Sequence, residues 1–437
     1  MSKKKGLRAT AFLAALSILA SMVMSPVAVT RAQQPQVAPL APNARNAAVM
    51  AATEAVLGET SRIRKLAILR PVKSGAQSRA EIERMIIKNM DEDTTPEEMR
   101  ASEIALKKLG LVPADFAFRP FIIRLLTEQV AGYYDPKAQQ FYLADWIDLN
   151  GQETVMAHEL THALQDQHFN LRRFEKWPKG DSDAELAVHA LIEGDATLTM
   201  IRYMWSDITR ALAFAKSMES SKSSSEQIDN APRSLRETLL FPYEQGTEWC
   251  TALYGRGGWA RISQAFTELP QSTEQILHTE KYFQHEAPVK IEIADVHSQL
   301  GSNWKRVDND VNGEWGYYLI LDEFLKSSAE SKRAAAGWGG DRYAVYEGPQ
   351  PGDVFIAQLS AWDSESDAVE FFDAYARRTE RRYKDASPLE HDKTGLLRAW
   401  QTGEGGVRME RRGARVLILE GVPEKANAQS LMSALWK

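Results

Sequence analysis

The chain has 437 residues, of which 44% are hydrophobic and 26% are charged, and this composition excludes a wholly disordered protein. The length predicts two or three domains. The formal net charge of −6 makes nucleic acid a poor candidate partner, because nucleic-acid-binding surfaces are basic. The single cysteine, Cys250, excludes an intramolecular disulfide, and its apolar context predicts a buried thiol rather than a nucleophile.

The first 32 residues have the pattern of a cleaved secretory signal peptide. A basic stretch, residues 3–8, precedes the apolar run 11–24, and Ala32 provides a small residue at the expected cut. The apolar run is short for a membrane span, so an uncleaved N-terminal anchor is only the alternative. We therefore expect a secreted or periplasmic protein with no stable membrane span after cleavage. Loss of five basic and no acidic residues changes the formal charge to −11.

The next segments differ in character. Residues 33–45 are rich in proline and predict an extended linker. Residues 46–115 show helical periodicity and predict an N-terminal helical segment, which is either a subdomain or a pro-segment. Residues 128–145 contain two β-rich runs around an Asp-Pro turn, which is the pattern of a hairpin.

Two helices are predicted after the hairpin, over residues 153–167 and from 183 past 200. Residues 287–437 alternate strand and helix patterns and predict a separate C-terminal domain of unknown role. The predicted fold class is α+β, with a mainly helical catalytic domain that includes a small edge hairpin, followed by a C-terminal α+β domain.

The first of these two helices carries the sequence His158-Glu159-Leu-Thr-His162. The two histidines are four residues apart, so both imidazoles project from one face of the helix and can bind the same metal ion. Glu159 lies between them and can act as a general base toward water at the metal. The pattern predicts a site for one Zn²⁺ ion, whereas two structural core histidines are the alternative.

A catalytic zinc site needs a third protein ligand and leaves one position open. The second helix offers Glu185, His189 and Glu193, spaced by four residues. We predict Glu193 as the ligand, followed by His189 and then Glu185. Gly194, directly after Glu193, would allow a neighbouring helix to approach closely.

Carboxylates that orient the metal-bound imidazoles are also expected. Asp166 follows His162 by four residues on the same helix, and Asp195 lies on the second helix, so both are candidates. An oxyanion donor is expected further along the chain. His278 is the first candidate, and Tyr282 and Tyr243 are the alternatives. The strand around residues 139–143 is the candidate edge for pairing with a peptide backbone.

The segment 158–166, His-Glu-Leu-Thr-His-Ala-Leu-Gln-Asp, resembles the active-site helix of thermolysin-like gluzincins. The resemblance implies a zincin-like domain, here assigned to residues 116–286, with zinc held by His158, His162 and a glutamate that matches Glu193 in kind. The motifs His-Glu-Leu-Thr-His-Ala-Leu-Gln-Asp-Gln and Glu-Gly-Asp-Ala, at 158–167 and 193–196, are also similar to those of uncharacterised secreted bacterial proteins described as metallopeptidases.

The sequence therefore predicts a secreted zinc metallopeptidase whose partner is a peptide or protein substrate. Two alternatives remain. One is a catalytically inactive, metal-stabilised binding or scaffold protein, which a fourth ligand such as His189 would favour. The other is a zinc hydrolase that acts on a substrate other than a peptide.

Overall fold

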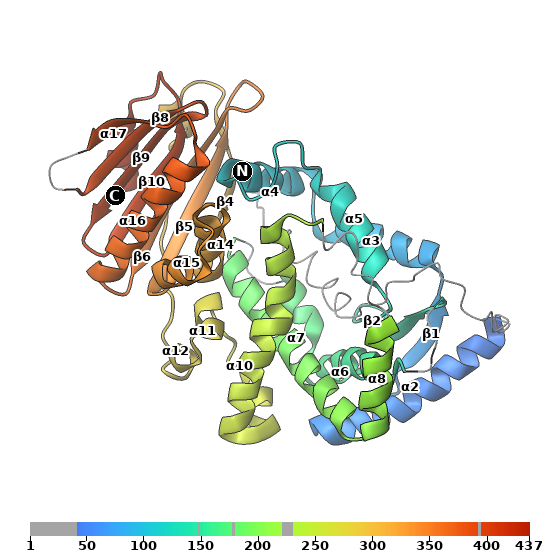
Figure 1. Cartoon of the computed structure of the whole chain (residues 1–437). Helices are drawn as coiled ribbons and strands as arrows, with labels where there is room; N and C mark the ends of the chain where they lie inside the picture. Colours follow the sequence, from blue (N-terminus) through green and yellow to red (C-terminus); the bar gives the residue numbers. More distant parts are fainter. Residues whose placement is uncertain (1–41, 147–148, 150, 177–179, 221–229, 392–394) are drawn as a thin grey trace, which may run out of the picture.

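The computed structural model describes residues 42–437 except 147–148, 150, 177–179, 221–229 and 392–394. A mainly helical part and a C-terminal layer built on a large sheet lie side by side, which confirms the α+β class (Figure 1). The predicted signal peptide, residues 1–32, lies outside the described residues. Helix α2 begins at Pro42, inside the predicted linker 33–45, and proline suits the start of a helix because its missing N–H is not needed there.

The helical part is organised around helix α6, Glu153–Phe169, whose residues 154–166 are all buried. A helix that is buried on every side must be surrounded by other elements. Helices α2, Pro42–Arg64, and α7, Ser182–Trp205, pack against it. The remaining elements of this part are α3 (Arg79–Asp93), α4 (Pro96–Leu109), α5 (Phe118–Gln129), the 3-10 helix η1 (Leu171–Lys176), α8 (Ile208–Ser220), α10 (Arg233–Ala265), α11 (Thr273–Leu277) and α12 (Thr279–Phe283).

The predicted hairpin is present as strands β2, Gly132–Asp135, and β3, Gln140–Ala144. A third strand, β1, Lys73–Gln77, pairs with β3 in parallel and gives the sheet order β1-β3-β2. Strand β3 is therefore central, and the prediction that residues 139–143 form an edge was wrong. Strand β1, which comes from a distant part of the chain, pairs with the side of β3 that faces away from β2. The edge strand of the hairpin is therefore β2.

The C-terminal layer is a seven-stranded antiparallel sheet in the order β4-β5-β6-β10-β9-β8-β7. Helices cover both of its faces, as a sheet with two apolar faces requires. The elements are α13 (His297–Leu300), β4 (Lys305–Asp310), α14 (Gly313–Leu325), α15 (Ser328–Ala335), β5 (Trp338–Glu347), β6 (Val354–Trp362), α16 (Glu365–Arg382), β7 (Ser387–His391), β8 (Leu397–Thr402), β9 (Gly405–Arg412), β10 (Arg415–Val422) and α17 (Ala428–Leu435).

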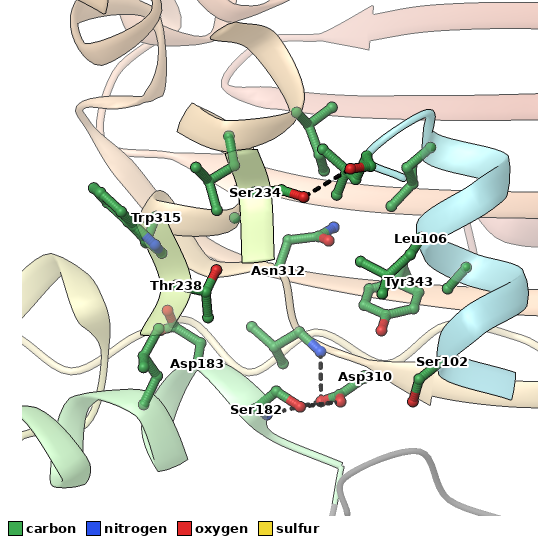
Figure 2. A pocket seen from close by; sticks show the side chains of 18 of the residues that line it. Ser102, Leu106, Ser182, Asp183, Ser234, Thr238, Asp310, Asn312, Trp315 and Tyr343 are labelled. Carbon is green, nitrogen blue, oxygen red and sulfur yellow. Dashed lines mark hydrogen bonds between the residues drawn. The ribbon is translucent and has the colours of Figure 1, made fainter. Parts of the chain in front are cut away.

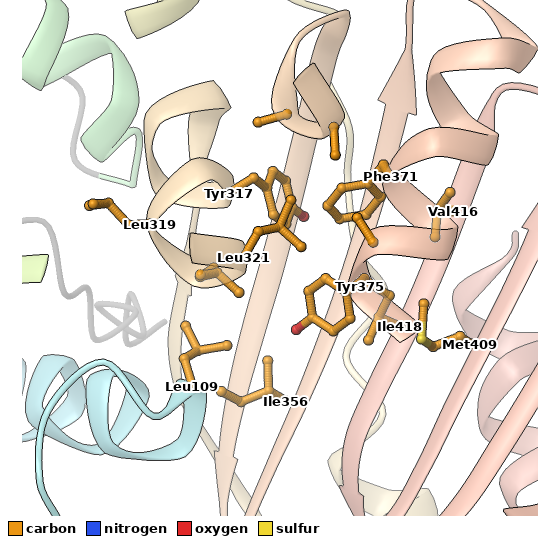
Figure 3. Close-up of a cluster of buried hydrophobic side chains, with 14 of the residues drawn as sticks. Leu109, Tyr317, Leu319, Leu321, Ile356, Phe371, Tyr375, Met409, Val416 and Ile418 are labelled. Carbon is orange, nitrogen blue, oxygen red and sulfur yellow. The ribbon is translucent and has the colours of Figure 1, made fainter. Parts of the chain in front are cut away.

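The two faces of this sheet have separate cores. Helices α14 and α16 place Tyr317, Phe371 and Tyr375 against one face, as Figure 3 shows. Helix α4 joins the same core through Leu109, although it precedes the metal motif in the chain. On the other face, α17 and the segment 291–300 contribute a second cluster.

The N-terminal segment 46–115 is built into three different cores. Helix α2 contributes to the core beneath α6, α3 shares a core with α5, and α4 packs on the C-terminal sheet. The predicted domain boundary at 115/116 therefore falls inside a shared core. These contacts favour a structural subdomain over a pro-segment, because its removal would expose apolar surface in all three clusters.

The residues that the structure describes contain no helix with the length and hydropathy of a membrane span.

Candidate metal centre

Three predicted ligands meet in one buried cluster. The Nε2 atoms of His158 and His162 lie 3.2 Å apart, and Oε2 of Glu193 lies 3.1 Å from the first and 3.4 Å from the second. The three side chains are between 2% and 5% exposed. Helix α6 supplies both histidines and α7 supplies the glutamate, so the packing of these two helices assembles the cluster.

The spacing of these three atoms fits a tetrahedral metal ion. Nitrogen and oxygen ligands of zinc lie about 2.0–2.1 Å from the ion, so two of them are about 3.3 Å apart in a tetrahedron. The observed separations of 3.1, 3.2 and 3.4 Å match one triangular face. The donor set of two imidazoles and one carboxylate is also one that catalytic zinc uses.

The charges within the cluster favour a cation. Burial by itself would raise the pKa of Glu193, but the charge of His162 and hydrogen bonds to both histidines hold that pKa well below its usual value. Glu193 is therefore ionised at neutral pH. Burial works against a charged His162, yet the neighbouring Glu193 raises the pKa of His162.

A close approach of two helices brings Glu193 to this position. A Cβ atom on Gly194 would lie 2.2 Å from the carbonyl oxygen of Gly246 on α10, and one on Gly246 would lie equally close to the carbonyl oxygen of Ala190. Only glycine fits at such a contact. The expectation that Gly194 permits a neighbouring helix to pack closely is confirmed.

Glu159 lies next to the ligands on α6 and is 2% exposed. Its Oε2 accepts a hydrogen bond of 3.1 Å from the backbone N–H of Tyr134 on the edge strand β2. Burial raises the pKa of Glu159 to about 8. The carboxyl group is thus held in place by the strand that borders the site.

Asp166 has a role different from the predicted one. Its Oδ2 accepts hydrogen bonds from the hydroxyl of Tyr134 at 2.9 Å and from Arg70 at 2.8 Å. It binds neither metal-site imidazole. Because Tyr134 also donates its backbone N–H to Glu159, Asp166 fixes the strand that holds the Glu159 carboxyl group.

Gln165 is the residue that orients His162, and sequence reasoning missed it. Its Oε1 lies 2.8 Å from Nδ1 of His162, and its Nε2 donates to Oδ2 of Asp195 at 2.9 Å. Asp195 in turn pairs with Arg64 of α2 at 2.5 Å, and both side chains of this ion pair are fully buried. The predicted direct contact of Asp195 with an imidazole was therefore wrong, because Gln165 takes that position and Asp195 contacts Gln165 instead.

The alternative third ligands lie outside the cluster. Glu185 and His189 precede Glu193 on α7, and neither joins the group of close ligand atoms. Burial lowers the pKa of His189 to about 4, so this imidazole is neutral at physiological pH. Among the described residues, the cluster therefore offers three candidate ligands, the number that a catalytic zinc site with an open position uses.

His278 is not at the metal cluster, so its prediction as the oxyanion donor is not supported. It follows α11, and its Nε2 lies 2.9 Å from Oε1 of Glu314 on α14. Helix α11 lies apart from α6 (Figure 1). The hydrogen bond to Glu314 raises the pKa of His278 despite partial burial.

Tyr243 of α10 is the downstream candidate that the fold brings to the site. Its ring stacks on the imidazole of His158 with a centroid separation of 6.0 Å. Tyr282, the other tyrosine considered, donates its hydroxyl to the carbonyl oxygen of Glu268. Helix α10 packs along α7, and this packing places Tyr243 beside the ligands.

A second acidic group, formed by Glu274, Glu286 and Asp363, already binds the ammonium group of a lysine. Nζ of Lys281 lies 2.7, 2.6 and 2.5 Å from the three carboxylates, respectively. The ammonium group occupies the position that a cation would take. We therefore assign this group to the contact between α11, α12 and the sheet layer rather than to a metal site.

Part of the chain matches a family model. Residues 299–432 match the model of a domain of unknown function, DUF8575. This range lies within the predicted C-terminal domain and covers the strands of the large sheet from β4 to β10. No curated protein and no solved structure matches the chain.

Proposed function

We propose that this protein is a zinc-dependent metallopeptidase, secreted or periplasmic, that hydrolyses peptide bonds. The observation that carries the proposal is the spacing of the three ligand atoms of His158, His162 and Glu193, which fits a tetrahedral zinc ion. Glu159 beside them supports a catalytic role, because a purely structural site has no need of an additional buried carboxyl group.

Each residue has a distinct part in the proposed reaction. His158, His162 and Glu193 would hold zinc, which when bound polarises a carbonyl group and acidifies water. Glu159 accepts a proton from the attacking water and returns it to the leaving amine, so the peptide bond is replaced by a carboxyl group and an amine. Tyr243, beside His158, is the proposed donor to the oxyanion.

The edge strand β2 is the proposed binding place for the substrate backbone. The N–H of Tyr134 points to Glu159 rather than to β3, which places the outer edge of β2 at the site. An extended peptide could add to this edge by main-chain hydrogen bonds, and pockets for its side chains would provide specificity.

A peptide library tests the proposal. The chain from residue 33 onward, loaded with zinc, should cleave library members, and Glu159→Gln should lower the rate by about 10²–10⁴-fold while zinc remains bound. Glu153→Gln is the matched control, because Glu153 is exposed on the same helix. Zinc binding without cleavage by wild type would indicate a scaffold, and cleavage of other substrates alone would indicate a different zinc hydrolase.

A further inference from the structure

A cavity of about 140 Å³ lies where the N-terminal segment, helices α7 and α10, and the C-terminal layer meet. Helices α4, α7, α10 and α14 surround it, and Asp310 and Tyr343 of the large sheet complete the wall (Figure 2). Its lining is largely aliphatic, with Leu106 and Leu109 from α4, Leu186 from α7, Leu235 from α10, and Leu319 and Ile320 from α14.

The polar side chains in the wall are mostly engaged with partners of their own. The hydroxyl of Ser234 donates to the carbonyl oxygen of Leu111 at 2.8 Å, and that of Tyr343 donates to Asp308 at 3.2 Å. These bonds satisfy the polar groups without a ligand, so the interior offers chiefly apolar contacts.

The size and the lining define what the cavity can bind. An apolar cavity of about 150 Å³ lined by Leu, Ile and Phe stays dry and accepts benzene. A charged ligand would lose its hydration in this largely apolar lining without gaining an opposite charge, so the cavity favours an uncharged one. We propose that this cavity is a binding site for an uncharged apolar group of about the size of benzene, such as a single aromatic ring or a branched alkyl group.

The position of the cavity allows two sources for this group. Leu186 lines it, and Glu193 lies seven residues later on the same side of α7, about 10 Å along the helix axis. The group is therefore either a free small molecule or an apolar side chain of a bound polypeptide. The cavity exists whether or not the metal cluster is catalytic, so its occupancy can be measured without turnover.

Benzene is the first probe, with benzoate as the charged counterpart of similar size. The melting temperature of the full mature chain should rise in a saturable manner with benzene, because a ligand that binds only the folded state stabilises it. Benzoate at the same concentration should give no shift. Absence of a saturable shift with benzene up to its solubility limit would overturn the proposal.

Two variants connect the shift to this cavity. Ala105→Leu fills the space from α4 and should abolish the benzene shift, whereas Ala80→Leu, at an exposed position on α3, should leave it unchanged. Leu319→Ala enlarges the space and should allow naphthalene to bind, which the wild type excludes. A benzene shift that persists in Ala105→Leu, with naphthalene still excluded by Leu319→Ala, would place the binding elsewhere and refute the assignment.

A competition experiment distinguishes the two sources of the apolar group. N-acetylphenylalaninamide, compared with N-acetylalaninamide, presents the same backbone with and without an aromatic ring. Displacement of benzene by the phenylalanine compound alone would identify a polypeptide side chain as the occupant. Benzene binding that neither compound displaces would identify a free small molecule.

Discussion

The buried ion pair between Arg64 and Asp195 should control both the stability of the helical part and the affinity of the metal site. Arg64→Met removes the charge, keeps most of the volume and leaves Asp195 buried without its partner. Both side chains are fully buried, and loss of one member of such a pair costs about 3–5 kcal/mol of unfolding free energy.

The expected loss of zinc affinity follows from the hydrogen bonds that connect this ion pair to His162. Asp195 holds Gln165, and Gln165 holds the Nδ1 side of His162. Loss of a direct partner of a metal ligand weakens metal binding by about 10–100-fold. We expect about 100-fold for Gln165→Met and about tenfold for Arg64→Met, because Arg64 acts through two intervening side chains.

The assay combines denaturant unfolding with zinc competition against a chelator of known affinity. The matched control is Arg378→Met, because Arg378 and Glu420 also form a fully buried ion pair, but in the C-terminal layer. Both variants should lose similar stability, whereas only Arg64→Met should weaken zinc binding. Equal zinc affinities of the two variants would refute the proposed connection from α2 to His162.

Three further predictions concern the surroundings of the site. Tyr243→Phe should lower turnover by at least tenfold and leave zinc affinity unchanged, as steady-state kinetics and chelator competition would show; full activity would remove Tyr243 from the reaction. Gly194→Ala should cost about 1–3 kcal/mol in denaturant unfolding, because its Cβ would meet the Gly246 carbonyl, whereas Gly255→Ala on the exposed side of α10 should not destabilise the protein. His278→Gln should leave turnover intact and remove a pH-dependent contribution of about 1 kcal/mol or less. Since Glu314 raises the pKa of His278, this contribution is complete below about pH 6.5 and disappears as the pH rises through the folded-state pKa. A stability difference between wild type and this variant that grows from pH 6 to pH 9 would contradict the assignment.

Local periodicity was sufficient to predict the centre of the site. The four-residue spacing of His158 and His162 defines one face of a helix, and the structure places both side chains in the cluster. The same helical spacing also places Gln165, three residues after His162, near that imidazole. Asp166 was predicted instead because only carboxylates were considered as partners of the histidines. The hairpin was also predictable, because β2 and β3 are joined by a short turn.

Long-range pairing was not predictable from these patterns. Strand β1 pairs with β3 across 67 residues, so the edge position changes from β3 to β2. Arg64 lies 131 residues from Asp195, and nothing in its own helix indicates a partner near the metal site. The prediction that His278 lies at the metal cluster failed for the same reason. Its partner is Glu314, on a helix that follows later in the chain.

The zinc content of two glutamine variants tests the central claim most directly. Glu193 and Glu185 are both buried on α7, but only Glu193 belongs to the ligand cluster. Wild type and Glu185→Gln should each bind one zinc ion per chain, and Glu193→Gln should lose it in the presence of a competing chelator. Retention of zinc by Glu193→Gln, or its loss in Glu185→Gln alone, would contradict the proposed metal centre.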